Sequence, residues 1–233
     1  MGVIVTPVTV SPILRRPDRR FLLSVYHLLR ERYGHARWWP GESAFEVCLG
    51  AILTQNTSWS NVEKALGVLR RRGLLSFQAL RKLPSTRIAP LIRSSGTYRV
   101  KARRIASFLA FLEDYGGRPR ALARETLPEV RTKLLRVKGI GPETADSILL
   151  YAAGLPVFVI DAYTRRIFFR LGLLNGQESY AEIQALFAAN LPRDAGLFND
   201  YHAQIVRLGK EVCRTRPRCG DCPLEGRCLK RGL

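Results

Sequence analysis

Apolar residues recur with helical spacing in almost every segment of the chain that is rich in them. Residues 19–34 are a clear example, and Gly34 is a stop signal at their end. Their apolar positions share one face of a helix: Phe21, Leu22, Val25, Leu28 and Leu29. Residues 45–55 are instead almost wholly apolar, which predicts a central helix that is buried on all sides.

Nine further segments show helical patterns, several of them closed by Gly or Pro. They are residues 60–73, 76–83, 85–96, 98–117, 127–137, 142–154, 162–172, 179–192 and 197–213. We find no strand-like alternation, no repeat of fixed period and no low-complexity tract. The pattern therefore predicts an all-α protein.

The composition fits a globular chain. Apolar residues make up 46% of the 233 residues, enough for one large domain or two small ones that share a core. No run of eighteen apolar residues occurs, so we expect no membrane span. The first 20 residues lack the order of a signal peptide, because their charges follow the apolar stretch. We expect them to form an extended tail of a cytoplasmic protein.

The charge indicates the class of partner. Lys and Arg total 38 against 19 acidic residues, a formal charge of +19. Such an excess is typical of proteins that bind a polyanion, although a bias toward Arg codons would also raise it. The basic residues cluster, however: residues 93–104, RSSGTYRVKARR, hold five of them and no acid. We therefore expect a nucleic acid as partner.

Two glycines flank Ile140 in residues 134–150, LLRVKGIGPETADSILL. Pro142 would occupy a first helical position, where a missing N–H costs nothing. Gly139 and Gly141 allow a sharp turn and the close approach of a ligand. The amides of the turn and the N-terminus of the next helix would bind an anion. A plain αα-hairpin has the same pattern, but beside the positive charge we favour a clamp on a backbone phosphate.

Three segments resemble DNA glycosylases related to endonuclease III, in the helix-hairpin-helix (HhH-GPD) superfamily. Residues 134–146, LLRVKGIGPETAD, are similar to the family's helix-hairpin-helix. Residues 157–172, VFVIDAYTRRIFFRLG, resemble its catalytic-aspartate segment. Residues 49–66, LGAILTQNTSWSNVEKAL, resemble the helix and loop whose glutamine enters the DNA stack. The resemblance runs from about residue 20 to the C-terminus.

This resemblance implies a two-lobed helical fold. Residues 36–155 would form a six-helix barrel lobe, with the helix-hairpin-helix at 134–150. Residues 1–35 and 156–233 would form a second helical lobe that carries an iron–sulfur loop at 213–228.

Four cysteines lie close together near the C-terminus, with the spacing C-x5-C-x2-C-x5-C. They are Cys213, Cys219, Cys222 and Cys228. Four such thiolates indicate a metal site, since disulfides are not expected in a cytoplasmic chain. The spacing alone allows zinc as well as iron–sulfur. The resemblance implies a structural [4Fe-4S] cluster, although the family's first gap is generally one residue longer than the gap here.

Other residues of these segments have simpler interpretations. Arg214, Arg216 and Arg218 lie in the first gap, so we expect the loop to present positive charge to a DNA phosphate. Cys48 lies within the apolar segment 45–55, where a buried core thiol is expected.

Family members that cut the DNA strand use a lysine early in the second hairpin helix to form a Schiff base. Glu143 stands at the position that matches this lysine. A glutamate cannot form an imine, so the resemblance implies a glycosylase without the usual lyase step. Lys138 is near in sequence but precedes the turn. Glu143 itself is interpreted as a residue that stabilises the helix N-terminus.

The resemblance makes Asp161 the catalytic carboxylate. Breaking an N-glycosidic bond builds positive charge on the sugar, which a fixed anion stabilises. The carboxylate could also orient or deprotonate the attacking water. Asp161 could equally cap the helix that follows, and both roles can hold together.

All three tryptophans fall within 22 residues: Trp38, Trp39 and Trp59. A flipped base is held by stacking and edge contacts, so these rings are candidates for a base pocket, although core packing would also use them. The pattern most resembles bacterial helix-hairpin-helix 3-methyladenine glycosylases, in which aromatic residues matching Trp39 and Trp59 enclose the alkylated purine. That subgroup can lack the cysteine loop.

We expect the remaining DNA contacts to flank this pocket. Gln55 would fill the gap left by the flipped base, and residues 95–98, with Thr97 and Tyr98, would lie on the other side of the duplex. Asn56 would contact DNA or brace its turn. The hairpin residues Gly139, Ile140 and Gly141 and the arginines Arg214 and Arg216 complete the predicted DNA-binding set.

The sequence thus predicts a monomeric, monofunctional DNA N-glycosylase that acts on a damaged base in double-stranded DNA, with alkylated purines first. One alternative is an endonuclease III-type glycosylase for oxidised pyrimidines with weak or atypical lyase activity. Another is a non-catalytic DNA-binding protein that keeps the hairpin.

Overall fold

The computed structural model describes residues 18–36 and 38–233, and within these ranges the chain is helical without any strand. The all-α prediction is confirmed. The predicted N-terminal tail lies mostly outside the described residues. No helix in the described part of the chain has the length and apolar character needed to cross a membrane.

Eleven α-helices follow one another in the described ranges. They are α1 (Arg19–Tyr33), α2 (Ala44–Leu53), α3 (Trp59–Arg71), α4 (Phe77–Arg81), α5 (Ser85–Leu91), α6 (Tyr98–Glu113), α7 (Leu127–Arg136), α8 (Pro142–Ser147), α9 (Ala162–Arg170), α10 (Tyr180–Asn190) and α11 (Ala195–Glu211). Short 3₁₀ segments lie at Arg93–Ser95, Pro119–Arg124, Cys219–Asp221 and Glu225–Arg227.

Two predicted helices differ from the structure in their second halves. The segment 85–96 is α-helical only as far as Leu91, and a 3₁₀ turn at Arg93–Ser95 follows. The segment 142–154 begins as α8 and then widens into a π-helix at Ile148–Ala152. Apolar spacing does not distinguish these helix types, because the period changes little within one turn.

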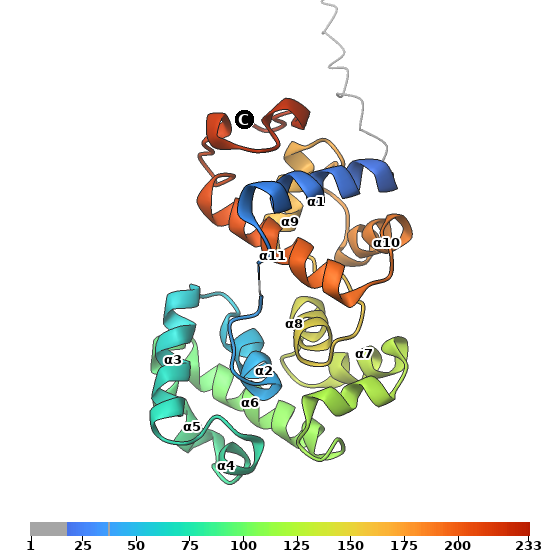
Figure 1. Ribbon diagram of the computed structural model, residues 1–233. Helices are drawn as coiled ribbons and strands as arrows, with labels where there is room; N and C mark the ends of the chain where they lie inside the picture. Colours follow the sequence, from blue (N-terminus) through green and yellow to red (C-terminus); the bar gives the residue numbers. More distant parts are fainter. Residues whose placement is uncertain (1–17, 37) are drawn as a thin grey trace, which may run out of the picture.

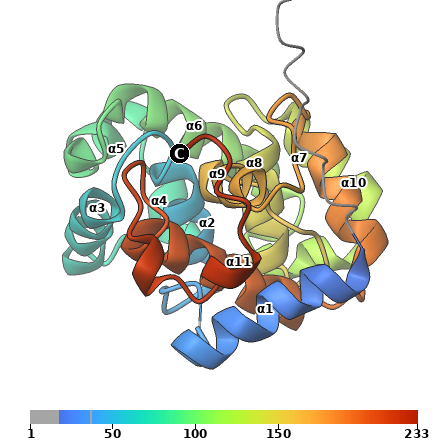
Figure 2. The same cartoon turned by 90° about the horizontal axis from the view of Figure 1, so that it is seen from above.

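The helices form two groups (Figure 1). One group contains α2 to α8, and the other contains α1, α9, α10, α11 and the C-terminal loop. The chain passes between the groups twice, once after α1 and once before α9. Seen from above, α3 to α5 lie on one side of α2, and α7 and α10 lie on the other (Figure 2). The arrangement agrees with a two-lobed fold, while the boundary at residues 36 and 155 stays a prediction.

One hydrophobic core runs through both groups, and buried residues of each group contribute to it. All nine residues from Phe45 to Leu53 of α2 are buried, the charged Glu46 included, as its almost wholly apolar sequence predicts. Cys48 is among them, and burial raises the pKa of its thiol well above the ordinary value. In the other group the aromatic rings of Phe158 and Phe187 stack with their centroids 4.2 Å apart. Burial of these apolar surfaces is the main source of stability.

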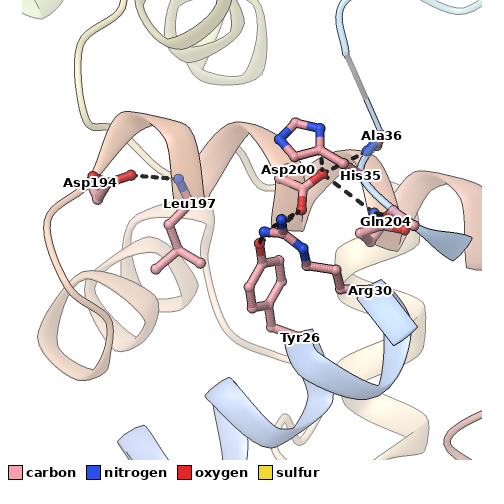
Figure 3. Close-up of polar contacts among 9 residues, drawn as sticks. Tyr26, Arg30, His35, Ala36, Asp194, Leu197, Asp200 and Gln204 are labelled. Carbon is pink, nitrogen blue, oxygen red and sulfur yellow. Dashed lines mark hydrogen bonds and ion pairs between the residues drawn. The ribbon is translucent and has the colours of Figure 1, made fainter. Parts of the chain in front are cut away.

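A buried carboxylate fastens α1 to α11 (Figure 3). Asp200 on α11 is 1% exposed and accepts hydrogen bonds from the Tyr26 hydroxyl at 2.8 Å and from the Ala36 amide at 2.8 Å. Arg30 and His35 lie within ion-pair range, at 3.7 and 3.6 Å. These contacts fix the start of the segment that leads to the tryptophans at positions 38 and 39.

Candidate active site

Two adjoining cavities lie where the two helix groups meet. The larger, of about 810 Å³, is next to the glycine hairpin and is called the hairpin-side cavity. The smaller, of about 370 Å³, is lined by the three tryptophans and is called the tryptophan-side cavity. Six residues line both: Thr54, Asn56, Glu143, Ser147, Asp161 and Ala162. A ligand in either cavity therefore contacts the same two carboxyl-bearing residues.

Asp161 is held as the N-cap residue of α9. Its Oδ1 accepts hydrogen bonds from the Thr164 amide at 2.7 Å and from the Thr164 hydroxyl at 2.9 Å. Both interpretations of this residue can thus apply at once. Oδ1 caps the helix, and Oδ2 is free of it and lies 3.5 Å from Nε2 of His202.

Asp161 is buried yet favours its charged form. Burial alone would raise the pKa of its carboxyl group, but His202 and the two donors of Thr164 lower it by more. The pKa of Asp161 therefore lies below its ordinary value. A permanent negative charge faces the two cavities at neutral pH.

Tyr151 and His202 stand behind Asp161, and sequence reasoning did not single them out. His202 comes from α11 and is 4% exposed, and its Nδ1 is hydrogen-bonded to the Tyr151 hydroxyl. Tyr151 comes from the π-helical segment, and its ring lies 5.2 Å from that of Trp39. A chain of contacts therefore connects the tryptophans to the carboxylate.

Glu143 faces the same space as Asp161, from the first turn of α8. The protein atoms around its carboxyl group and the negative charge of Asp161 raise its pKa, although His202 and Arg165 act in the opposite direction. The two carboxyl groups thus differ in acidity within one site. Lys138, in contrast, lines neither cavity.

The three tryptophan rings touch one another. The Trp39 and Trp59 centroids are 5.3 Å apart with an interplanar angle of 83°, an edge-to-face pair. Trp38 lies 5.5 Å from Trp39, and Nζ of Lys210 lies 5.6 Å from the Trp38 ring centre. A base could stack between Trp39 and Trp59 only after one ring turned. Lys210 is an amine in the tryptophan-side cavity that the sequence analysis missed.

The two hairpin glycines serve different needs. Gly139 has φ +90°, a left-handed conformation, and a Cβ there would lie 2.3 Å from Cγ of Arg104. Gly141 has φ −93° and no atom within 4 Å of an added Cβ. The fold therefore requires Gly139 but not Gly141. The bare backbone at Gly141 leaves room for a ligand at the cavity surface.

This difference predicts that alanine at position 139 lowers stability, whereas alanine at position 141 lowers DNA affinity. Gly139→Ala should lower the free energy of unfolding by about 1–3 kcal/mol, because Ala is strained in that conformation. Gly141→Ala should leave stability within about 0.5 kcal/mol but weaken duplex binding, because its methyl group would occupy space that the predicted phosphate clamp leaves for its ligand. Urea denaturation and DNA titration measure the two effects. Wild-type affinity in Gly141→Ala would exclude close backbone contact there.

Gln55 is tied to the hairpin. Its Nε2 donates to the Gly139 carbonyl at 3.1 Å and to the Thr144 hydroxyl at 2.8 Å, and its Oε1 accepts from Arg104. The predicted entry of Gln55 into DNA would require these bonds to break. Asn56, next in sequence, has a left-handed backbone with φ 52° and lines both cavities.

The other predicted DNA contacts lie outside these two cavities. Tyr98, at the start of α6, lines a separate cavity of about 530 Å³ together with Arg93, Arg99 and Arg103. Thr97 is the exposed N-cap residue of the same helix. The structure therefore brings Gln55 and the hairpin together with Asp161, but does not place Thr97 or Tyr98 in that cleft.

The C-terminal loop holds the four thiols near one another, and none forms a disulfide. Burial, followed by the neighbouring Cys213, Cys228 and Cys219, raises the pKa of Cys222 to about 11. Within residues 18–36 and 38–233, no three His, Cys, Asp or Glu side chains converge as ligands of one metal ion.

A buried arginine, Arg170, braces the start of this loop. Arg170 donates to Sγ of Cys213 at 3.3 Å and to the Thr215 carbonyl at 3.1 Å. Arg214 and Arg216 are exposed, as expected for residues that meet DNA. Their contact with DNA stays a prediction.

A family model described as HhH-GPD superfamily base excision DNA repair protein matches residues 49–193. A candidate DNA repair glycosylase of Methanocaldococcus jannaschii is 42% identical over 213 residues, which cover 90% of this chain and 96% of the relative. Endonuclease III of Thermotoga maritima is 31% identical over 186 residues, 79% of this chain and 82% of the relative.

A solved structure is similar as well. It is the H. pylori 3-methyladenine DNA glycosylase bound to 1,N6-ethenoadenine. The two structures agree with a TM-score of 0.72 at 29% identity, and the match covers 83% of this chain and 98% of that one. The resemblance found in the sequence is therefore confirmed.

Proposed function

The chain belongs to the HhH-GPD superfamily of base excision DNA repair proteins, and from this premise we propose that it is a monofunctional N-glycosylase for alkylated purines. The family assignment makes it a DNA glycosylase of base excision repair. The substrate and the absence of a lyase step are the proposal.

The observation that carries the proposal is the buried, ionised Asp161 at the wall shared by both cavities. Phosphates held at the hairpin would place the sugar of an extruded nucleotide near this wall. A flipped base would then enter the tryptophan-side cavity. As the base departs, the sugar gains positive charge, and the fixed carboxylate stabilises it.

We propose no lyase step because no suitably placed amine was found beside Asp161 among the described residues. Glu143 occupies the lysine position and cannot form an imine. Among the described residues, Lys210 is the lysine that lines either cavity, and it lies against Trp38. Base release by water, without covalent capture, is the reaction that these side chains support.

Alkylated purines are proposed because the pocket suits a cationic base. The aromatic faces of Trp38, Trp39 and Trp59 attract a positive charge, by roughly 0.5–2 kcal/mol per ring. An alkylated purine already carries this charge, so it leaves without strong acid assistance. The likeness to the H. pylori 3-methyladenine DNA glycosylase agrees with this choice.

The four cysteines are proposed to hold a structural [4Fe-4S] cluster. The four thiols lie near enough to one another that Cys213, Cys228 and Cys219 raise the pKa of Cys222, as expected of residues that share one bound group. Their spacing allows zinc as well as iron–sulfur, and the resemblance to endonuclease III favours the cluster. Iron and acid-labile sulfide in equal amounts would support it, and zinc without sulfide would contradict it.

An endonuclease III-type activity is the second candidate. The cysteine loop and the identity to the Thermotoga maritima enzyme favour it. It would require an amine that reaches the sugar, and Lys210 is the candidate that the cavity offers.

A panel of lesion duplexes tests the proposal. Duplexes with an alkylated purine, an oxidised pyrimidine or no lesion are incubated with the protein, then treated with or without alkali. We expect release of the alkylated purine and nicks only after alkali. Nicks without alkali, together with borohydride trapping, would contradict a monofunctional enzyme. No release from any lesion would favour a non-catalytic DNA-binding protein.

The charge of +19 predicts a steep dependence of DNA binding on salt. Each neutralised phosphate releases counterions, so the logarithm of affinity should fall with the logarithm of salt concentration at a slope of about −0.9 per phosphate. Titrations of an undamaged duplex at several salt concentrations measure this slope. A flat dependence would contradict phosphate binding.

A further inference from the structure

Two aromatic rings of the tryptophan-side cavity lie directly on a helix backbone at a glycine. A Cβ added to Gly50, inside α2, would lie 3.0 Å from Nε1 of Trp39 and 3.5 Å from both Cε2 and Cζ2 of the same ring. A Cβ added to Gly209, inside α11, would lie 2.3 Å from Cδ1 of Tyr163. Trp39 and Tyr163 line the cavity, whereas the two glycines do not. Each ring therefore has a glycine on one side and the cavity on another.

Glycine at these two positions needs a physical reason, because it is unfavourable inside a helix. It loses more backbone freedom on folding than alanine does, so alanine is the better residue wherever a Cβ fits. Gly67, inside α3, shows the contrast: the atom nearest to its added Cβ is Nη1 of the flexible Arg71 side chain, at 3.4 Å. At Gly50 and Gly209 the atoms in the way belong to rigid aromatic rings. The contacts with these rings account for the missing Cβ.

Trp39 has neighbours on its other sides too, so it cannot move without changing the cavity. Its ring centroid lies 5.2 Å from that of Tyr151, 5.3 Å from that of Trp59 and 5.5 Å from that of Trp38. The ring borders the tryptophan-side cavity and also a second cavity, of about 430 Å³. A methyl group at position 50 would push the indole off α2. Movement into the first cavity would narrow the space for a base, and movement into the second would withdraw the face on which a base stacks.

We propose that Gly50 positions Trp39 for stacking on the extruded base, because its lack of a Cβ lets the indole lie against the α2 backbone. Gly50 is a positioning residue, since it acts through Trp39 and does not itself line the cavity. The inference rests on the proposed function, which places the base in this cavity. A purine presents two fused rings to the indole, so its release depends on this contact more than the release of a pyrimidine would.

The Gly50→Ala variant tests the proposal on a duplex with an alkylated purine that the wild type releases. Its single-turnover rate should fall by at least about tenfold, because a small displacement of the stacking ring misplaces the reacting nucleotide. Its affinity for an undamaged duplex should change by less than about twofold, since that affinity comes from phosphate contacts. Gly67→Ala is the matched control and should leave both quantities unchanged. A wild-type rate in Gly50→Ala, or an equal loss of rate and duplex affinity, would overturn the proposal.

A double-mutant cycle with Trp39→Phe shows whether the effect passes through Trp39. The smaller phenylalanine ring lacks the indole nitrogen that the methyl group would meet. Gly50→Ala should therefore slow Trp39→Phe by less than about twofold, although it slows the wild type much more. If alanine at position 50 slowed both backgrounds equally, Trp39 would not be the residue that Gly50 positions.

Tryptophan fluorescence of the free protein tests the inference independently of any activity. The three tryptophans of the chain all lie in this ring cluster, so their emission reports on it alone. Gly50→Ala should shift the emission spectrum, and Gly67→Ala should not. An unchanged spectrum in Gly50→Ala would overturn the proposal, even if base release by the wild type confirmed the proposed function. A shifted spectrum combined with an inactive wild type would instead count against the proposed function alone.

Discussion

The Asp161→Asn variant should release a damaged base about a thousandfold more slowly than the wild type. An anion about 4 Å from a cationic sugar, at an effective dielectric near 20, stabilises it by on the order of 4 kcal/mol, and this energy corresponds to about that factor. Asn keeps the oxygen that accepts from the Thr164 amide, so the cap on α9 should persist. Single-turnover assays with excess protein measure the rate of the chemical step.

A second helix cap gives the matched control. Asp194 caps α11 through a bond from the Leu197 amide at 2.6 Å, as Asp161 caps α9. Asp194→Asn should change neither base release nor thermal unfolding by a measurable amount. Wild-type activity in Asp161→Asn would remove that residue from the mechanism. Equal losses in both variants would show that helix capping, not charge, is responsible.

The pKa of Asp161 also determines how the base-release rate of the wild type depends on pH in acid solution. Burial raises the pKa of Asp161, but His202 and Thr164 lower it by more, so the folded protein keeps the charge at pH values where a free Asp is already protonated. The rate should therefore hold as the pH falls to about 3.9, the ordinary pKa of Asp, as long as the protein stays folded. It should decline only below that value. A decline that began near pH 6 would point to another titrating group.

The Glu143→Lys variant should gain a lyase activity that the wild type lacks. It would place an amine at the mouth of both cavities, next to Asp161. An amine there can attack the sugar and form an imine in its neutral form, which the positive end of α8 favours and the negative charge of Asp161 opposes. Strand nicks should then appear without alkali, and borohydride should trap a protein–DNA adduct. Both products should rise from background to readily detected levels.

Two variants make this result specific. Glu143→Gln changes the charge without adding an amine and should give no trapped adduct. Lys210→Met in the Glu143→Lys background removes the other lysine of the cavity and should leave trapping intact. Trapping that disappeared with Lys210 would mean that the native lysine reaches the sugar. In that case the wild type itself should be trapped, in contradiction of the proposed monofunctional enzyme.

Local sequence patterns predicted the helices and the parts of the site that lie within one segment. The apolar run at 45–55 became the buried helix α2, and Pro142 begins α8 as its lack of an N–H allows. The cap at Asp161 needs only the residues that follow it. Each of these features depends on neighbours in the chain, which the sequence displays directly.

The remaining parts of the site arise from contacts between distant segments. Tyr151 and His202 are 51 positions apart and meet only when α11 packs against the π-helical segment. His202 alone looked like one polar residue in an amphipathic helix. Arg104 likewise belongs to a basic stretch in which Arg93, Arg99 and Arg103 face solvent, and Lys210 is one of several exposed basic residues near the end of α11. No periodicity distinguishes them, because their role depends on which side chain lies opposite.

The edge-to-face contact of Trp39 and Trp59 is a further case. Aromatic residues at the matching positions predicted a pair of rings around a base, and the rings do line the expected cavity. Their relative orientation depends on Tyr151, Lys210 and the α2 backbone, which the local sequence does not reveal.

The most direct measurement of the central claim is a crystal structure of Asp161→Asn bound to a duplex that contains the preferred lesion. The substitution is expected to slow turnover enough to keep the intact nucleotide in place. We predict an extruded nucleotide whose base lies in the tryptophan-side cavity and whose sugar C1′ lies about 4 Å from the residue 161 side chain. A nucleotide whose sugar lay far from residue 161, or one that stayed stacked in the duplex, would contradict the account.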